Sequence, residues 1–133
     1  MILLDTHVAL WIATNSSLGK QSRTLVEQAL AEDGLAISAI SFWEISLLIV
    51  KNRFKTAKTA ATLRAELLDT GIVELPLTGP IAILAVQLQN LHGDPADRFI
   101  AATAIVHDAT LMTADKRLLN WRNKTMKRQN ASK

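Results

Sequence analysis

Short apolar runs that alternate with longer segments of helical spacing are the feature that most limits how this chain can fold. Four such runs are present, at residues 2–4, 35–38, 72–75 and 110–113. Their shortness and apolar character predict strands that are buried on both faces of a sheet. Because a helical segment separates each run from the next, we expect an α/β fold, a three-layer α/β/α sandwich with a central, mostly parallel sheet.

The helical segments between these runs can be bounded from spacing and from turn residues. We expect helices over residues 6–13, 20–31, 41–51, 58–69, 78–91, 97–107 and 116–120. Gly71 follows the fourth of these and suits the left-handed position after a helix end. Beyond Trp121 the composition turns polar and predicts no element. The chain therefore divides into one domain over residues 1–121 and a basic tail over residues 122–133.

Length and composition restrict the class of protein further. A chain of 133 residues is long enough for one domain with a proper core. No cysteine is present, which excludes disulfides and thiolate metal sites. The longest apolar run, residues 45–50, is too short to span a bilayer, and the first residues do not resemble a signal peptide. We therefore expect a cytoplasmic protein with no membrane partner.

Charge is distributed unevenly along the chain. Residues 1–115 hold 8 basic and 12 acidic residues, whereas residues 116–133 hold 7 basic residues and no acidic one. A second basic group lies at Lys51, Arg53, Lys55 and Lys58. Basic segments beside an acidic body suit a polyanion that is held by its backbone. For the tail, a solvated and partly disordered segment is an equally good interpretation.

Four carboxylates are the candidates for a functional site: Asp5, Glu44, Asp97 and Asp115. Asp5 and Asp115 come just after the first and fourth apolar runs. Glu44 and Asp97 are expected in the first turns of helices. Since ligands of open parallel sheets bind beyond the carboxyl ends of the strands, these four side chains are expected to meet at one edge.

Each carboxylate also has a purely structural interpretation. Asp5 and Asp115 suit helix N-caps, and Ser41 with Glu44 matches a capping box. Asp94 suits the cap of a helix in which Asp97 interacts favourably with the dipole. Capping explains each acid singly, but it gives no reason for all four to be acidic at one edge.

A joint site of this kind needs a cation. Two carboxylates within ~4 Å of each other repel strongly unless a positive charge intervenes. Mg²⁺ or Mn²⁺ prefers oxygen ligands, whereas the histidine and cysteine spacing that zinc requires is missing. One or two such ions can activate water and stabilise a leaving oxygen, so the pattern predicts a magnesium site for phosphodiester chemistry.

With these motifs in this order, the chain resembles the PIN-domain ribonucleases, specifically toxins of the VapC type from bacterial toxin–antitoxin pairs. The motifs are Leu3-Leu4-Asp5-Thr6-His7, Trp43-Glu44-Ile45, Gly93-Asp94-Pro95-Ala96-Asp97-Arg98 and Thr113-Ala114-Asp115. The resemblance covers nearly the whole chain. It implies Mg²⁺- or Mn²⁺-dependent endoribonuclease activity, homodimerisation and a tight complex with a VapB-like antitoxin.

The resemblance also implies roles for single residues. The family's acidic metal site falls on Asp5, Glu44, Asp97 and Asp115, with Thr113 as its hydroxyl neighbour and Asp94 in a supporting place. The implied reaction is hydrolysis of single-stranded or looped RNA to a 5′-phosphate and a 3′-hydroxyl. In this hypothesis the three aspartates bind the ion or ions, and Glu44 holds a second metal or positions the water.

Two other functions fit parts of the sequence. In an aspartate-based phosphotransferase, Asp5 would be a nucleophile, but His7 stands where such sites want a second aspartate. The other alternative is a catalytically silent PIN-like RNA-binding module. The presence of all four acids argues against that loss of activity.

Several further residues carry weaker predictions. Thr6 could orient a ligand carboxylate, whereas His7, His92 and His107 stand alone and are not expected to participate. Arg98 suits a local ion pair with Asp94, and the alternative is an approach to a phosphate. The tryptophans suit core or interface positions, and Trp121 alone, beside the basic tail, is also a candidate for contacting a nucleic-acid base. Residues 45–50 are apolar nearly all round, which suits a dimer patch, an antitoxin groove or a fully buried core helix.

Overall fold

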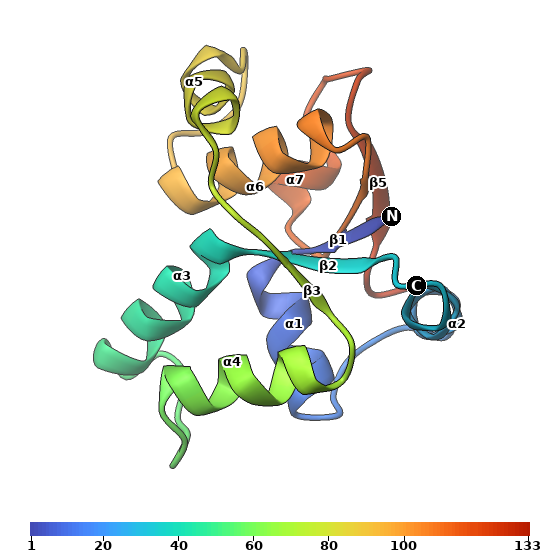
Figure 1. Ribbon diagram of the computed structural model, residues 1–133. Coiled ribbons are helices and arrows are strands. Elements are labelled where there is room, and N and C mark those ends of the chain that lie inside the picture. Colours follow the sequence, from blue (N-terminus) through green and yellow to red (C-terminus); the bar gives the residue numbers. More distant parts are fainter.

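A computed structural model, which describes all residues 1–133, has a five-stranded sheet at its centre (Figure 1). The strands are β1 (Ile2–Leu4), β2 (Leu35–Ser38), β3 (Val73–Leu75), β4 (Thr110–Thr113) and β5 (Lys127–Asn130). Every neighbouring pair is parallel, and the spatial order is β3-β2-β1-β4-β5. The four expected strands and the α/β/α class are thereby confirmed.

Seven helices connect the strands. They are α1 (Thr6–Ala13), α2 (Lys20–Ala31), α3 (Ala39–Val50), α4 (Ala60–Asp69), α5 (Gly79–Gln87), α6 (Pro95–Val106) and α7 (Lys116–Leu119). Gly71, just past the end of α4, has a φ of 108°, as predicted for a left-handed position. Helix α6 begins at Pro95, with the Asp94 side chain accepting a hydrogen bond from the Asp97 amide at 3.2 Å.

Helix α3 begins earlier than its sequence pattern predicts. Its N-cap is Ser38, whose hydroxyl accepts a hydrogen bond from the Ile40 amide at 3.2 Å. The capping box of Ser41 and Glu44 is therefore wrong, and Glu44 lies in the second turn of the helix. This shift leaves the Glu44 carboxylate free of the backbone and available to the site.

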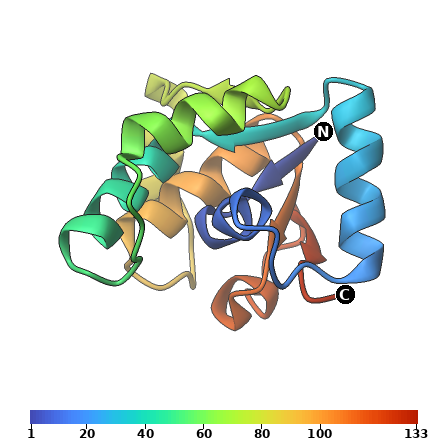
Figure 2. The same cartoon turned by 90° about the horizontal axis from the view of Figure 1, so that it is seen from below.

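Helices cover both faces of the sheet. Leu3 and Leu111 pack on the side of α5, α6 and α7, and Leu4 and Ile37 pack on the side of α1, α2 and α4. Figure 2, seen from below, shows α1 and α4 in front of the strands and α2 at one side. Helix α3 lies at the carboxyl end of β2, where it contacts α1, α4 and α6.

Strand β5 is an element that the sequence pattern does not predict. Its residues Lys127-Arg128-Gln129-Asn130 are all polar, yet they pair in register with Thr110–Thr113 of β4. The buried side chains of Met126 and Ala131 anchor its two ends. A polar strand is tolerated here because β5 lies at the sheet edge, where apolar alternation is not required. Residues 122–133 are therefore ordered around an edge strand.

Two arginines hold irregular segments in place. The Arg98 guanidinium donates to the carbonyl oxygens of Ala85, Val86, Leu88, Leu91 and His92. Arg128 donates in the same way to five carbonyl oxygens between residues 118 and 126. The expected ion pair of Arg98 with Asp94 is wrong, because these carbonyls take its donors. Two of these carbonyls, those of Ala85 and Val86, belong to the last turn of α5. Helix α5 ends at Gln87, whereas the sequence pattern predicts an end at residue 91.

The chain order places the site. From β1 the chain proceeds outward to β2 and β3, then crosses back to β4 on the other side of β1. The boundary between β1 and β4 is therefore a topological switch point, and the segments after these two strands diverge there. Asp5 follows β1 and Asp115 follows β4, so both carboxylates lie beside this opening.

No helix of the structure combines the length and the apolar character that a membrane-spanning segment requires.

Candidate metal and active site

An acidic hollow of about 500 Å³ opens at the carboxyl edge of the sheet. Its lining includes five carboxylates: Asp5, Glu44, Asp94, Asp97 and Asp115. The four acids singled out from the sequence thus surround the same space, although they come from four separate segments of the chain. We refer to this hollow, with these five residues, as the acidic pit.

Asp5 is buried, with 5 % of its surface exposed, and both its oxygens are engaged. Oδ1 accepts from the Thr6 amide at 2.8 Å, which caps α1. Oδ2 accepts from the Thr113 hydroxyl at 2.6 Å, and the Thr113 oxygen accepts in turn from the Asp115 amide at 3.0 Å. Thr113 therefore links the two aspartates across the switch point and fixes their orientation.

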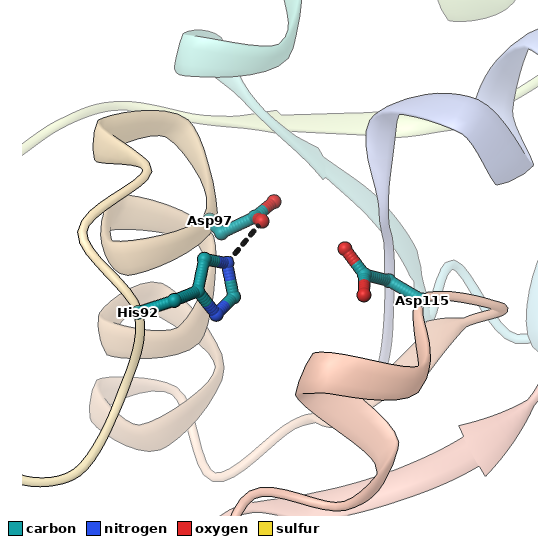
Figure 3. Close-up of side chains that lie close together, drawn as sticks. All are labelled: His92, Asp97 and Asp115. Atoms are coloured by element: carbon teal, nitrogen blue, oxygen red, sulfur yellow. Dashed lines mark hydrogen bonds and ion pairs between the residues drawn. The ribbon is translucent and has the colours of Figure 1, made fainter.

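Asp97 is the second buried carboxylate of the pit. Its Oδ2 lies 2.6 Å from Nε2 of His92, which belongs to the loop before α6. Figure 3 shows the Asp97 and Asp115 carboxylates facing each other across an open space, with His92 beside Asp97. Candidate ligand atoms of these three residues lie within 4.8 Å of one another, and those of Glu44, Asp94 and Asp97 form a second such group. Asp97 belongs to both groups.

Asp115 differs from the other acids because Arg117 bonds both of its carboxylate oxygens. Its Oδ1 caps α7 by accepting from the Arg117 amide at 2.8 Å, and its Oδ2 accepts from Arg117 Nη2 at 3.0 Å. The same Nη2 lies 3.5 Å from Asp97 Oδ2. Arg117 thus spans two of the carboxylates at the rim of the pit.

A buried hydroxyl pair supports the site between α1 and α3. The Thr6 hydroxyl donates to the Ser41 hydroxyl at 2.9 Å, and both residues are fully buried. This contact joins the start of α1 to α3 and so positions the helix that carries Glu44. A hydrogen bond from the Thr6 side chain also lowers the pKa of Glu44, against the larger effect of burial.

Burial and mutual repulsion disturb the ionisation of three acids. Burial raises the pKa of Asp5 and of Glu44 above their ordinary values. Burial, followed by the charges of Asp5 and Asp94, raises the pKa of Asp97 to about 6, although the His92 hydrogen bond opposes the rise. For Asp115, burial also acts upward, but hydrogen bonds from Arg117 outweigh it and lower the pKa.

The donor set fits a hard divalent cation. Carboxylate oxygens dominate the pit, and neither cysteine nor a closely spaced histidine pair is present. Mg²⁺ and Mn²⁺ prefer such oxygen ligands and retain water in their coordination shells. Burial raises the pKa of three of these acids, so their ionised forms are disfavoured in the protein, and a bound dication would favour ionisation.

Two residues of the site were not expected from the sequence. His92 was expected to stand apart, yet it contacts Asp97. Its position five residues before that acid has no recognisable spacing signal. Arg117, two residues after Asp115, was not singled out at all. The sequence feature that could have indicated Arg117 is its place beside a predicted cluster of acids, because such a cluster favours a nearby cation.

Trp121 is not the nucleic-acid contact that its place beside the basic tail predicts. Its indole is 5 % exposed, and its Nε1 donates to the Gln89 carbonyl at 2.8 Å. Trp43 is the exposed tryptophan, at 49 %. It lines a second hollow of about 210 Å³ that shares Glu44, Leu48, Arg53 and Asp94 with the acidic pit. The two hollows therefore lie side by side along α3, and we refer to them together as the groove along α3.

Comparisons with known proteins agree with this geometry. The PIN domain family matches residues 2–123 of the chain. The ribonuclease VapC22 of Mycobacterium tuberculosis strain H37Rv is 36 % identical over 124 residues, which cover 92 % of each protein.

Solved structures share the fold at lower sequence identity. The DNA-bound VapBC of Salmonella typhimurium has a chain that superposes with a TM-score of 0.69 at 18 % identity, covering 96 % of both chains. The VapBC2 complex of Rickettsia felis, bound to a promoter DNA fragment, gives 0.68 at 18 % identity, with 98 % of both chains covered. VapBC-1 of nontypeable Haemophilus influenzae gives 0.64 at 23 % identity over the full length of both chains. At these identities the likeness concerns the fold.

Proposed function

This chain belongs to the PIN-domain family, and on that premise we propose that it is a VapC-type endoribonuclease toxin, dependent on a divalent cation and neutralised by a VapB-like antitoxin. The observation that carries the proposal is the buried Asp97, which belongs to both groups of closely spaced ligand atoms. Helix capping gives no reason to bury this carboxylate among other acids, whereas a metal site requires several carboxylates close together.

Each side chain has a role in this proposal. Asp5, Asp97 and Asp115 hold Mg²⁺ or Mn²⁺, and Glu44 holds a second ion or positions the attacking water. When bound, such an ion lowers the pKa of water and stabilises charge on the leaving oxygen of the phosphodiester. Thr113 keeps Asp5 in orientation through its 2.6 Å hydrogen bond. His92 does the same for Asp97, since Nε2 donates when that carboxylate is ionised.

The groove along α3 is the proposed path of the RNA strand. The exposed indole of Trp43 can stack on a base, and exposed Lys51 and Arg53 at the same hollow can contact phosphates. Arg128 is committed to backbone carbonyls, and Lys127 pairs with Asp108 at 3.2 Å. The tail therefore offers the RNA its exposed residues Arg122, Lys124 and Lys133 rather than its whole charge.

Two exposed apolar surfaces suit the protein partners. Helix α3 is not a fully buried core helix, since Val50 at its end is 77 % exposed. On α5, Ile83 and Val86 are 62 % and 81 % exposed. An antitoxin lying on α3 would cover the groove and block RNA entry, and a second copy of the chain is the other proposed partner. Light scattering of the chain alone and with its antitoxin tests both; a monomer in both samples contradicts them.

The catalytic proposal is tested by RNA cleavage with single carboxamide variants. We expect Asp5→Asn and Asp97→Asn to abolish cleavage in the presence of Mg²⁺ or Mn²⁺, with the fold intact by circular dichroism. Asp108→Asn is the matched control, because this acid lies outside the pit and is exposed. Chelation should stop wild-type cleavage, and either ion should restore it. Unchanged cleavage in both pit variants would refute the nuclease assignment.

The same experiment separates the alternative of a silent RNA-binding module. Such a module would retain RNA in chelator and would show no cleavage after Mg²⁺ or Mn²⁺ is restored. The convergence of all five acids on one hollow favours the enzyme.

A further inference from the structure

Arg117 is the one cation that is bonded to the carboxylates of the acidic pit. Its Nη2 lies 3.0 Å from Asp115 Oδ2 and 3.5 Å from Asp97 Oδ2, and its Nε lies 3.3 Å from Asp115 Oδ1. The side chain is nevertheless 58 % exposed. Its backbone amide is fixed by the cap of α7, so the guanidinium can move while its Cα stays in place.

Arg117 contacts two of the carboxylates that the proposal assigns to the metal. Asp97 and Asp115 each offer a candidate ligand oxygen, and a dication bound to these carboxylates would repel the guanidinium that contacts them at 3.0–3.5 Å. The two cations therefore compete for the same carboxylates. Metal binding must weaken or break the contacts of Arg117, and its exposed side chain can then turn toward the opening of the pit.

An RNA strand would bring negative charge to that opening. Guanidinium groups pair with phosphate oxygens through two parallel hydrogen bonds, which suits Arg117 once its carboxylates are taken by metal. We propose that Arg117 exchanges partners during the catalytic cycle: it neutralises Asp97 and Asp115 in the metal-free protein and contacts the RNA phosphate backbone in the loaded one. This inference rests on the proposed nuclease function and adds a substrate-contacting residue to it.

If Arg117 exchanges partners in this way, its removal should strengthen Mn²⁺ binding and slow RNA cleavage. Removing the guanidinium removes a competitor of the metal, so Arg117→Gln should bind Mn²⁺ roughly two- to five-fold more tightly, as expected for an exposed ion pair. The same variant should cleave RNA roughly 10- to 100-fold more slowly at saturating Mn²⁺, because a positioned cation at the phosphate is lost. A residue with only a structural role would weaken both properties.

The test titrates Mn²⁺ into the full chain by isothermal calorimetry and measures RNA cleavage by the same preparations. Lys116→Gln is the matched control, since it makes the same charge change on α7 at an exposed residue that has no ion pair. It should stay within about two-fold of the wild type in both assays. Arg117→Lys keeps the charge without the planar fork and should recover part of the cleavage rate.

Each outcome decides the inference. Tighter Mn²⁺ binding together with slower cleavage supports it, whereas equal Mn²⁺ affinity or unchanged cleavage in Arg117→Gln overturns it. If the wild-type protein cleaves no RNA at all, the nuclease proposal fails. The calorimetric comparison then still decides whether Arg117 competes with metal for the pit.

Discussion

Replacing Asp97 by asparagine should stabilise the metal-free protein, even though it destroys the proposed site. Burial and the charges of Asp5 and Asp94 raise the Asp97 pKa from 3.8 to about 6. A carboxyl with a raised pKa in the folded state is harder to ionise there than in the unfolded chain. Stability therefore falls as pH rises through the window from about 3.8 to about 6, and above that window the loss is complete.

The size of the effect follows from the same shift. Each pKa unit corresponds to about 1.4 kcal/mol, so the ionised Asp97 lowers the free energy of unfolding by up to about 3 kcal/mol at pH 7.5. Asparagine stays neutral and retains an acceptor for His92, so most of this loss should be recovered. For a domain of this size the gain corresponds to a Tm about 6–12 °C higher. At pH 4.5 the gain should shrink to about one third, because Asp97 is then mostly protonated.

The assay is thermal unfolding followed by circular dichroism in EDTA, at pH 7.5 and pH 4.5. Asp115→Asn makes the same chemical change at an acid whose pKa is lowered by Arg117, so it should be neutral or destabilising. Adding Mg²⁺ should raise the Tm of the wild type but not that of Asp97→Asn. If Asp97→Asn gains no stability at pH 7.5, or gains equally at both pH values, the repulsion argument is wrong.

Further predictions concern the supports of the site. Thr113→Val removes the hydroxyl that links Asp5 to Asp115, so Mn²⁺ affinity by calorimetry should fall about ten-fold; unchanged affinity would rule out this orienting role. Arg98→Lys keeps the charge but cannot reach five carbonyls, so urea unfolding should show a loss of about 2–3 kcal/mol, and a loss under 0.5 kcal/mol would contradict it. Wild-type Mn²⁺ affinity should fall steeply below pH 6, as Asp97 binds a proton that competes with metal; a constant affinity from pH 7.5 to pH 5 would disagree with its raised pKa.

Local sequence carried enough information for the first four strands. The strands β1, β2 and β4 are short apolar runs, and burial between two helical layers demands that pattern. The expected burial on both faces is wrong for β3, which lies at a sheet edge, contains Glu74 and leaves Val73 40 % exposed. Strand β5 has no such pattern, because a sheet edge tolerates Lys127, Arg128 and their polar neighbours. The position of β5 depends on backbone pairing with β4 and on the hydrogen bonds that Arg128 donates to backbone carbonyls. Both are contacts between segments, which a local sequence pattern does not specify.

The acids were identifiable one by one, because Asp5 and Asp115 follow strands that must be parallel. Parallel strands end at one edge, so the proximity of these two carboxylates follows from the sequence pattern. The contacts that tune the site depend on distance in space. The charge state of Asp97 depends on His92, Asp5 and Asp94, and no spacing rule specifies how these lie around it.

Side-chain chemistry along the chain therefore determined which groups could bind a dication, since oxygen ligands, apolar strands and helix starts are local properties. Tertiary structure alone decided which partners the other polar side chains have. Arg98 donates to backbone carbonyls, Trp121 is buried in the core, and Arg117 contacts the carboxylates of the acidic pit. The physical reason is that hydrogen bonds, burial and Coulomb energies act through space, and they select among partners that the order of residues leaves equally available.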